Sequence, residues 1–185
     1  MGKRDSKGRK NLNEYFQKEF ILSIILIYAL SSTMLAVGIN EGVMQSEEQV
    51  SATVQEIEHM RQTVTAFDIF TNNVFIALIS AVPIAGVPFY LFVSYNTGMV
   101  YGAIGKYYGL TELQTMSLAF TNYIGIVETL ASCILVGESI FIVYLLIKDK
   151  EEAVERLKSH SWKSLLICVI MLLFGAFVEY WLIKL

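Results

Sequence analysis

Charged residues are scarce in this sequence, and that shortage is the first indication of its class. Asp, Glu, Lys and Arg make up 17% of the 185 residues, whereas a soluble domain usually contains about 25%. Apolar residues make up 55%, and the mean hydropathy is +0.53. The composition argues against an ordinary soluble domain and predicts a single domain whose surface largely faces lipid.

Cysteine, histidine and the usual catalytic motifs are also rare or missing. Cys133 and Cys168 lie in apolar stretches without CxxC spacing, and His59 and His160 are far apart in predicted loops. The sequence contains no nucleophile elbow, no HExxH motif and no Gly-rich phosphate loop beside a strand. We therefore expect a protein that is not an enzyme, with no catalytic residue, no metal site and no cofactor.

Long uncharged segments dominate what is present. Residues 20–39 carry no charge and are long enough to cross a bilayer core of about 30 Å. Their length favours an uncleaved span over a signal peptide. Residues 69–105 form a run of 37 uncharged residues, which is too long for one crossing. The Gly-Val-Pro motif at residues 86–88 therefore predicts a turn between two short spans, and Pro83 predicts a kink in the first.

The basic residues predict how these segments cross the membrane. Eleven of the 14 Lys and Arg residues lie within residues 1–19 and 148–163, so we place both segments in the cytoplasm. Residues 113–147 must then make one net crossing, with a kink, a tilt or a re-entrant half-helix near residues 122–125. A basic tail beside a span indicates topology control or anionic lipid rather than nucleic acid.

These observations predict an all-α, polytopic transmembrane helical bundle of about five spans in the cell membrane. One segment is kinked or re-entrant, and an amphipathic helix lies outside the cytoplasm. The expected organisation is a basic cytoplasmic N-terminus (1–19), span 1 (20–39), the extracytoplasmic amphipathic helix (40–68), a core of three spans (69–147), a cytoplasmic loop (148–163) and span 5 (164–185).

The polar and acidic segment 40–68 has apolar residues at heptad-like spacing. This seam consists of Val50, Thr53, Ile57, Met60, Val64 and Phe67. It predicts either packing on the membrane surface and on neighbouring helices or docking of a partner protein.

Polar residues within the predicted spans form the candidate site. A carboxylate at bilayer depth costs about 2.5–3.5 kcal/mol on insertion scales, so Glu128 should face the protein interior and find hydrogen-bond donors. The proposed intramembrane polar core consists of Asn72, Asn73, Asn96, Asn122, Glu128 and Ser132. It is either a hydrogen-bonded bundle core or a site for a proton or a substrate.

Four glycines recur at helical spacing in the third predicted span. They are Gly98, Gly102, Gly105 and Gly109. Small residues let helix backbones approach closely, and association in lipid depends on such packing. The stripe therefore predicts that another helix, or another subunit of a homo-oligomer or membrane-protein complex, lies against it.

Three short motifs of the central segment add a family resemblance. Residues 70–74 read Phe-Thr-Asn-Asn-Val, residues 95–98 read Tyr-Asn-Thr-Gly, and residues 125–128 read Gly-Ile-Val-Glu. In this order they resemble the Asn-rich first conserved span, the Asn-Gly span and the Pro-His-Gly-Ile-x-Glu motif of the stage II sporulation protein M family. Tyr123 and Ile124 stand at the Pro and His positions, so a role that needs the imidazole is not carried over.

The resemblance implies a multispan membrane protein that is a partner of peptidoglycan-degrading enzymes and not itself a hydrolase. It favours a non-enzymatic membrane scaffold or complex subunit. The alternative is a small-solute or ion transporter or channel with an intramembrane Asn/Glu site. That alternative predicts a water-accessible cavity that reaches Glu128.

Overall fold

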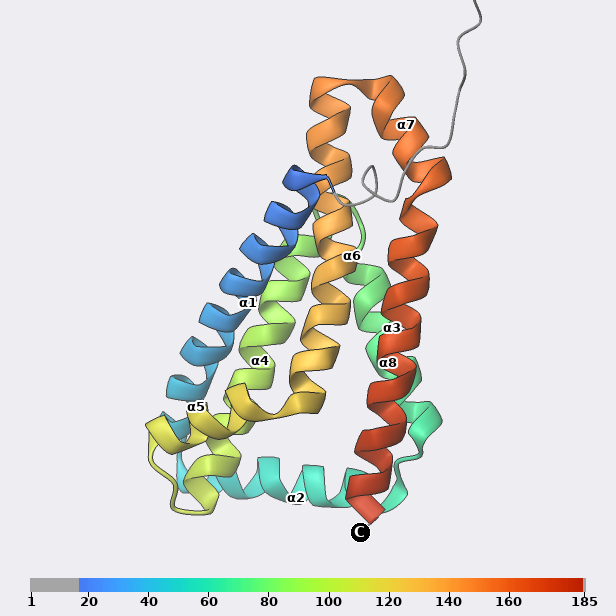
Figure 1. Cartoon of the computed structure of the whole chain (residues 1–185). Coiled ribbons are helices and arrows are strands. Elements are labelled where there is room, and N and C mark those ends of the chain that lie inside the picture. Colours follow the sequence, from blue (N-terminus) through green and yellow to red (C-terminus); the bar gives the residue numbers. More distant parts are fainter. Residues whose placement is uncertain (1–16, 185) are drawn as a thin grey trace, which may run out of the picture.

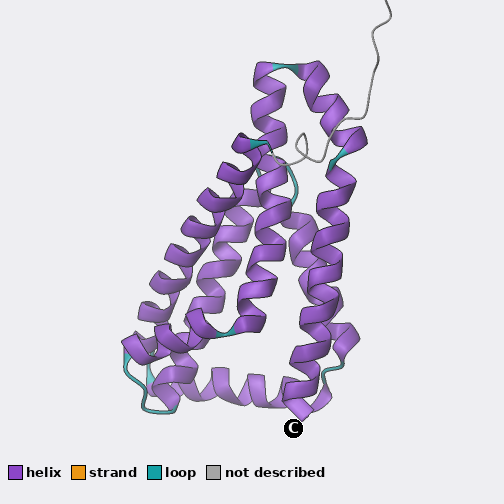
Figure 2. Ribbon diagram, viewed as in Figure 1, coloured by secondary structure: helices purple, strands orange, loops and turns teal. Residues whose placement is uncertain are grey.

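The computed structural model describes residues 17–184, which form eight helices and no strand (Figure 1, Figure 2). The predicted all-α fold is thus confirmed. Most of the predicted basic N-terminus lies outside the described residues. The helices are α1 (Lys18–Met44), α2 (Glu47–Thr63), α3 (Ala66–Ser80), α4 (Gly86–Tyr107), α5 (Glu112–Thr121), α6 (Tyr123–Lys148), α7 (Lys150–Ser159) and α8 (Ser161–Lys184).

Three helices, α1, α6 and α8, are long and apolar enough to cross a membrane. The helix α3 is shorter but apolar, and α4 has 22 residues and runs beside α1 (Figure 1). About five crossings therefore stays a prediction. Of the three long helices α6 is the central one, because 61% of its apolar window is buried, against 22% for α1 and for α8. Most of the apolar residues of α1 and α8 are therefore not buried within the bundle.

Three clusters of buried side chains hold the bundle together, and α6 contributes to each. One joins α6 to α1 and α7, a second joins it to α3 and α8, and a third joins it to α1 and α4. Residues at the centres of these clusters are Phe141, Leu135 and Val136 of α6. Helix association in lipid depends on close packing of this kind. Because α6 takes part in all three clusters, it is the helix around which the others are arranged.

The turn between α3 and α4 lies earlier in the chain than predicted. Its five residues, 81–85, include Pro83, so this proline follows the end of α3 instead of kinking it. Pro88 lies in the first turn of α4, where its missing N–H costs nothing because that N–H has no helical partner. Ile84 has a positive φ of 69°, an uncommon conformation for a β-branched residue.

The predicted break near residues 122–125 is confirmed, and α5 and α6 meet at Asn122. The short helix α5 contacts α1 and α4 before the chain turns into α6. Thr111 starts α5 with a capping box in which Gln114 returns the hydrogen bond. Capping boxes at Ser46 and Thr65 begin α2 and α3 in the same way.

The amphipathic helix is α2, which lies across one end of the bundle (Figure 1). It ends at Thr63, and Phe67 of the predicted seam belongs to α3 and is 71% exposed. Val50 and Val54 are the two buried residues of α2. The start of α1 and α7 lie at the opposite end, where Gln17 Nε2 donates to Glu152 Oε1 at 3.4 Å. The C-terminal end of α8 lies at the α2 end (Figure 1).

Candidate functional site

A cavity of about 620 Å³ collects much of the predicted polar core. We call it the Glu128 cavity. Residues from α1, α3, α4, α5, α6 and α8 line it, together with the end of α2. Four residues of the predicted core are among them, namely Asn72, Asn73, Glu128 and Ser132. Side chains from segments far apart in the sequence thus meet in one partly open space, lined by polar and apolar residues together.

The shortest polar contact of the cavity joins α3 to α6. Asn73 Nδ2 donates to Glu128 Oε1 at 2.6 Å, and Asn72 Nδ2 approaches Asn73 Oδ1 at a long 3.5 Å. Within the described part of the chain, the second carboxylate oxygen of Glu128 receives no hydrogen bond. The carboxylate therefore has one amide donor and one oxygen left for a ligand or water.

Asn122 has a different role from the one predicted. It is the N-cap of α6, where its side-chain oxygen accepts from the backbone N–H groups of Ile124 at 3.1 Å and Gly125 at 3.4 Å. Its Nδ2 donates to the hydroxyl of Tyr101 at 3.0 Å, and Tyr101 lines the cavity. Asn122 thus positions the first turn of α6 and borders the Glu128 cavity indirectly.

Asn96 is not brought to the cavity. Its Nδ2 donates to the backbone oxygen of Phe92 at 3.0 Å, one turn earlier in its own helix α4. This bond satisfies the amide locally, as Ser, Thr and Asn side chains in helices often do. Asn96 therefore does not belong to the polar core.

Two of the four glycines pack against α1. A methyl group added at Gly98 or Gly102 would meet the α1 backbone, at the carbonyl oxygens of Leu35 and Ile39 respectively. The facing residues of α1 are themselves glycines, Gly38 and Gly42, with Gly102 Cα 2.9 Å from the position of a Gly42 Cβ. The helix that lies on this part of the stripe is thus one of the same chain.

The other two glycines have separate surroundings. Gly105 faces the side chain of Thr115 in α5, which a Cβ would displace. Gly109 lies beyond the end of α4 with a positive φ of 69°, and a Cβ there would meet nothing within 4 Å. The prediction that Gly109 belongs to the packing stripe is wrong, because α4 ends at Tyr107. Gly109 instead adopts the left-handed conformation common just after a helix end.

The spacing of Gly38 and Gly42 is a signal that the sequence analysis missed. They stand four residues apart in a span, like Gly98 and Gly102, and small residues at this spacing favour close helix pairs in lipid. Two such pairs in one chain predict that the two helices pack on each other.

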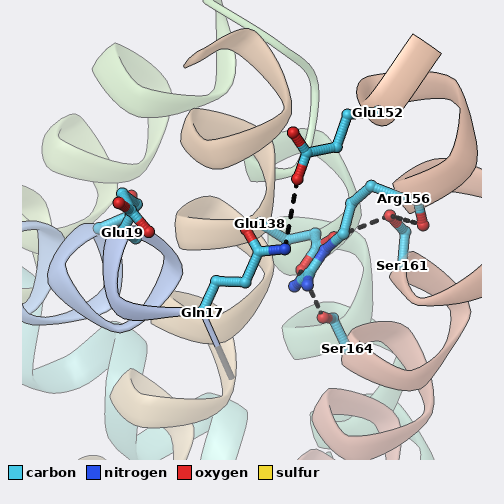
Figure 3. A network of polar contacts seen from close by, with 8 residues as sticks. Gln17, Glu19, Glu138, Glu152, Arg156, Ser161 and Ser164 are labelled. Carbon is cyan, nitrogen blue, oxygen red and sulfur yellow. Dashed lines mark hydrogen bonds and ion pairs between the residues drawn. The ribbon is translucent and has the colours of Figure 1, made fainter. Parts of the chain in front are cut away.

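A second polar cluster, a buried ion pair, lies at the α7 end of the bundle (Figure 3). The sequence did not predict that Arg156 is the partner of Glu138 in this pair. Arg156 Nε and Nη2 donate to the two oxygens of Glu138 at 2.8 and 2.7 Å. Ser161 and Ser164 donate to the same carboxylate, each at 2.8 Å. The side chains of Arg156 and Glu138 are only 3% and 4% exposed. We call this the Glu138–Arg156 cluster.

Aromatic rings complete the surroundings of the guanidinium. Its Cζ lies 4.6 Å from the ring centroid of Phe20 in α1 and 4.9 Å from that of Phe141 in α6. Such contacts stabilise a cation by about 0.5–2 kcal/mol. The Glu138–Arg156 cluster therefore joins α1, α6, α7 and the start of α8, and its geometry indicates a structural clamp.

The helical bundle and its three membrane-length apolar helices define an α-helical transmembrane protein. The family follows from comparison: the chain belongs to the stage II sporulation protein M family, whose model matches residues 19–182. The match confirms the resemblance of the three motifs and extends it to α1 and α8. Comparisons with curated proteins and with solved structures give no match.

Proposed function

We propose that this family member is a non-enzymatic, multi-pass membrane scaffold or complex subunit that presents α2 to a partner. The observation that carries this proposal is the exposure of α2. Only Val50 and Val54 of its 17 residues are buried, although a capping box and contacts with α4 hold it at the bundle end. A polar helix fixed in place with most of its surface free is suited to recruitment.

The charge distribution supports a cytoplasmic N-terminus. The start of α1 and the basic loop that contains α7 lie at the same end of the bundle, and α2 lies at the other. Basic segments prefer the cytoplasmic side, so α2 then faces outward. This orientation is part of the proposal, as are about five crossings.

Site-specific photo-cross-linking in intact cells tests the scaffold. A photoreactive residue replaces Gln55, which is exposed on α2, and as a matched control Phe174, which is exposed on α8. We expect a discrete protein adduct from Gln55 and lipid adducts alone from Phe174. If Gln55 yields no protein adduct, or if adducts at both positions are the same, the scaffold proposal is contradicted.

A second candidate function, a small-solute or ion transporter or channel, is favoured by the Glu128 cavity. The cavity reaches Glu128 and Asn73, as a transport site in this bundle requires. Ion or solute flux into liposomes that contain the purified chain tests this candidate. A flux that Glu128→Gln abolishes supports it, and equal flux with wild type, Glu128→Gln and empty liposomes counts against it.

A further inference from the structure

The described residues that line the Glu128 cavity include carboxylates from three helices and no basic side chain. Asp68, Glu128 and Glu179 line it, and among the described residues neither Lys nor Arg does. Arg61, an exposed residue near the end of α2, interacts electrostatically with Glu179 from outside the lining. A cavity lined by charges of one sign within low-dielectric walls concentrates ions of the other sign, so its occupant should be cationic.

The three carboxylates lie at different depths. Asp68 is exposed, whereas Glu128 and Glu179 are partly buried. Glu128 also has an oxygen without a hydrogen-bond donor among the described residues, next to the oxygen that accepts from Asn73. This second oxygen is not sealed off from solvent, so an occupant of the cavity can reach it. A cationic N–H donor supplies both the charge and the missing hydrogen bond.

The size and lining of the cavity favour an organic cation over a metal ion. The described residues contain no group of three or more His, Cys, Asp or Glu side chains that could hold a metal. The volume of about 620 Å³ falls within the range of about 300–1,000 Å³ usual for small-molecule sites. Apolar and aromatic residues such as Leu172, Ile76 and Tyr101 supply surface for a hydrocarbon portion.

We propose that the Glu128 cavity binds a small organic ammonium ion, with its N–H groups on Glu128 and its aliphatic part against the apolar lining. The inference uses the cavity of the second candidate function but requires binding alone, not transport. It is independent of the recruitment surface on α2.

Calorimetric titration of the full chain in lipid nanodiscs tests this proposal. The probe is n-propylammonium chloride, with 1-propanol as the neutral isostere and sodium chloride as the ionic-strength control. We expect saturable binding of n-propylammonium and none of the other two. Because a hydrogen-bonded charge pair is lost, Glu128→Gln should weaken binding about tenfold or more.

Glu41→Gln is the matched control variant. Glu41 accepts a hydrogen bond from Tyr95 at 3.1 Å and does not line the cavity, so this change should leave binding within about twofold. If Glu128→Gln does not yield a folded protein, Glu179→Gln serves instead, with an expected loss of about threefold or more because it removes one of the three carboxylates that line the cavity.

The proposal is overturned if n-propylammonium does not saturate, if 1-propanol binds equally well, or if the folded Glu128 or Glu179 variant binds like the wild type. Saturable, Glu128-dependent binding without any flux in liposomes keeps the ammonium site and removes the transporter. Flux of another solute without ammonium binding keeps the transporter and overturns the ammonium site.

Discussion

Replacing Arg156 by Met should strongly destabilise this protein, because it breaks the buried ion pair at the α7 end. Met keeps an unbranched apolar side chain, is shorter than Arg, and carries no charge and no donor. The change leaves Glu138 buried, 4% exposed, with the hydroxyls of Ser161 and Ser164 as its remaining donors in this cluster. It also removes the cation from the rings of Phe20 and Phe141.

The size of the loss in stability follows from the burial of the ion pair and its two hydrogen bonds. Breaking a buried ion pair by removing one partner costs about 3–5 kcal/mol, because the other charge stays desolvated. In a domain of about 150–250 residues, 1 kcal/mol shifts the Tm by about 2–4 °C, so Arg156→Met should lower the Tm by about 6–20 °C. The double variant Arg156→Met/Glu138→Leu removes both charges and should recover most of that loss, since apolar replacements of buried pairs are often neutral.

Thermal unfolding of the purified chain in nanodiscs, followed by circular dichroism, measures both variants. Arg61→Met is the control, because Arg61 is exposed and its replacement should change stability by no more than about 0.5 kcal/mol. A loss below about 1 kcal/mol for Arg156→Met would refute the clamp, given the cost expected for an unpaired buried charge. A double variant no more stable than the single one would show that the charge of Glu138 is not the cause.

Three further changes test the backbone of the fold by the same unfolding measurement. Gly102→Ala should cost about 1–3 kcal/mol by forcing α4 off α1, whereas Gly125→Ala should not destabilise, since its Cβ would meet nothing closer than 3.7 Å. Asn122→Ala should cost about 1 kcal/mol by removing the α6 cap; no loss would contradict that role. Ile84→Gly should raise stability by up to about 1 kcal/mol by relieving the positive φ, and a decrease would disprove the strain.

Some parts of the fold follow from local properties of the sequence. The uncharged residues 20–39 predict most of α1, and the long apolar run after residue 112, together with the charge balance, predicts a break where α5 and α6 meet at Asn122. Both inferences use quantities that a bilayer sets directly, the length of a span and the side on which basic residues stay.

Other parts depend on a choice between local alternatives. Pro83 and Pro88 both disfavour a helix, and the Gly-Val-Pro motif that contains Pro88 predicts the turn at the second. The turn forms at the first because Pro88, in the first turn of α4, lacks only an N–H that has no helical partner. The close approach of Gly86 to the end of α3 then needs a residue without a side chain.

In the candidate site, too, some contacts follow from the sequence and others depend on how the helices pack. Glu128 stands out because a carboxylate in a span needs a partner, and the structure gives it Asn73. Asn96 looks equivalent in the sequence but bonds its own helix. Glu138 needs a partner for the same reason, yet its partner Arg156 is 18 residues away in the sequence. Arg156 belongs to the segment predicted as a cytoplasmic loop, where membrane topology already accounts for the basic residues.

From the sequence alone it follows that this chain is a helical membrane protein of the stage II sporulation protein M family, with segments long enough to cross a bilayer. Apolar length, charge placement and short motifs carry that information residue by residue. Helix packing brings Gly98 and Gly102 against α1, buries Arg156 on Glu138, and gathers carboxylates from three helices around one cavity. Those pairings depend on which helix faces meet, and the periodicity of one helix does not specify the face of another.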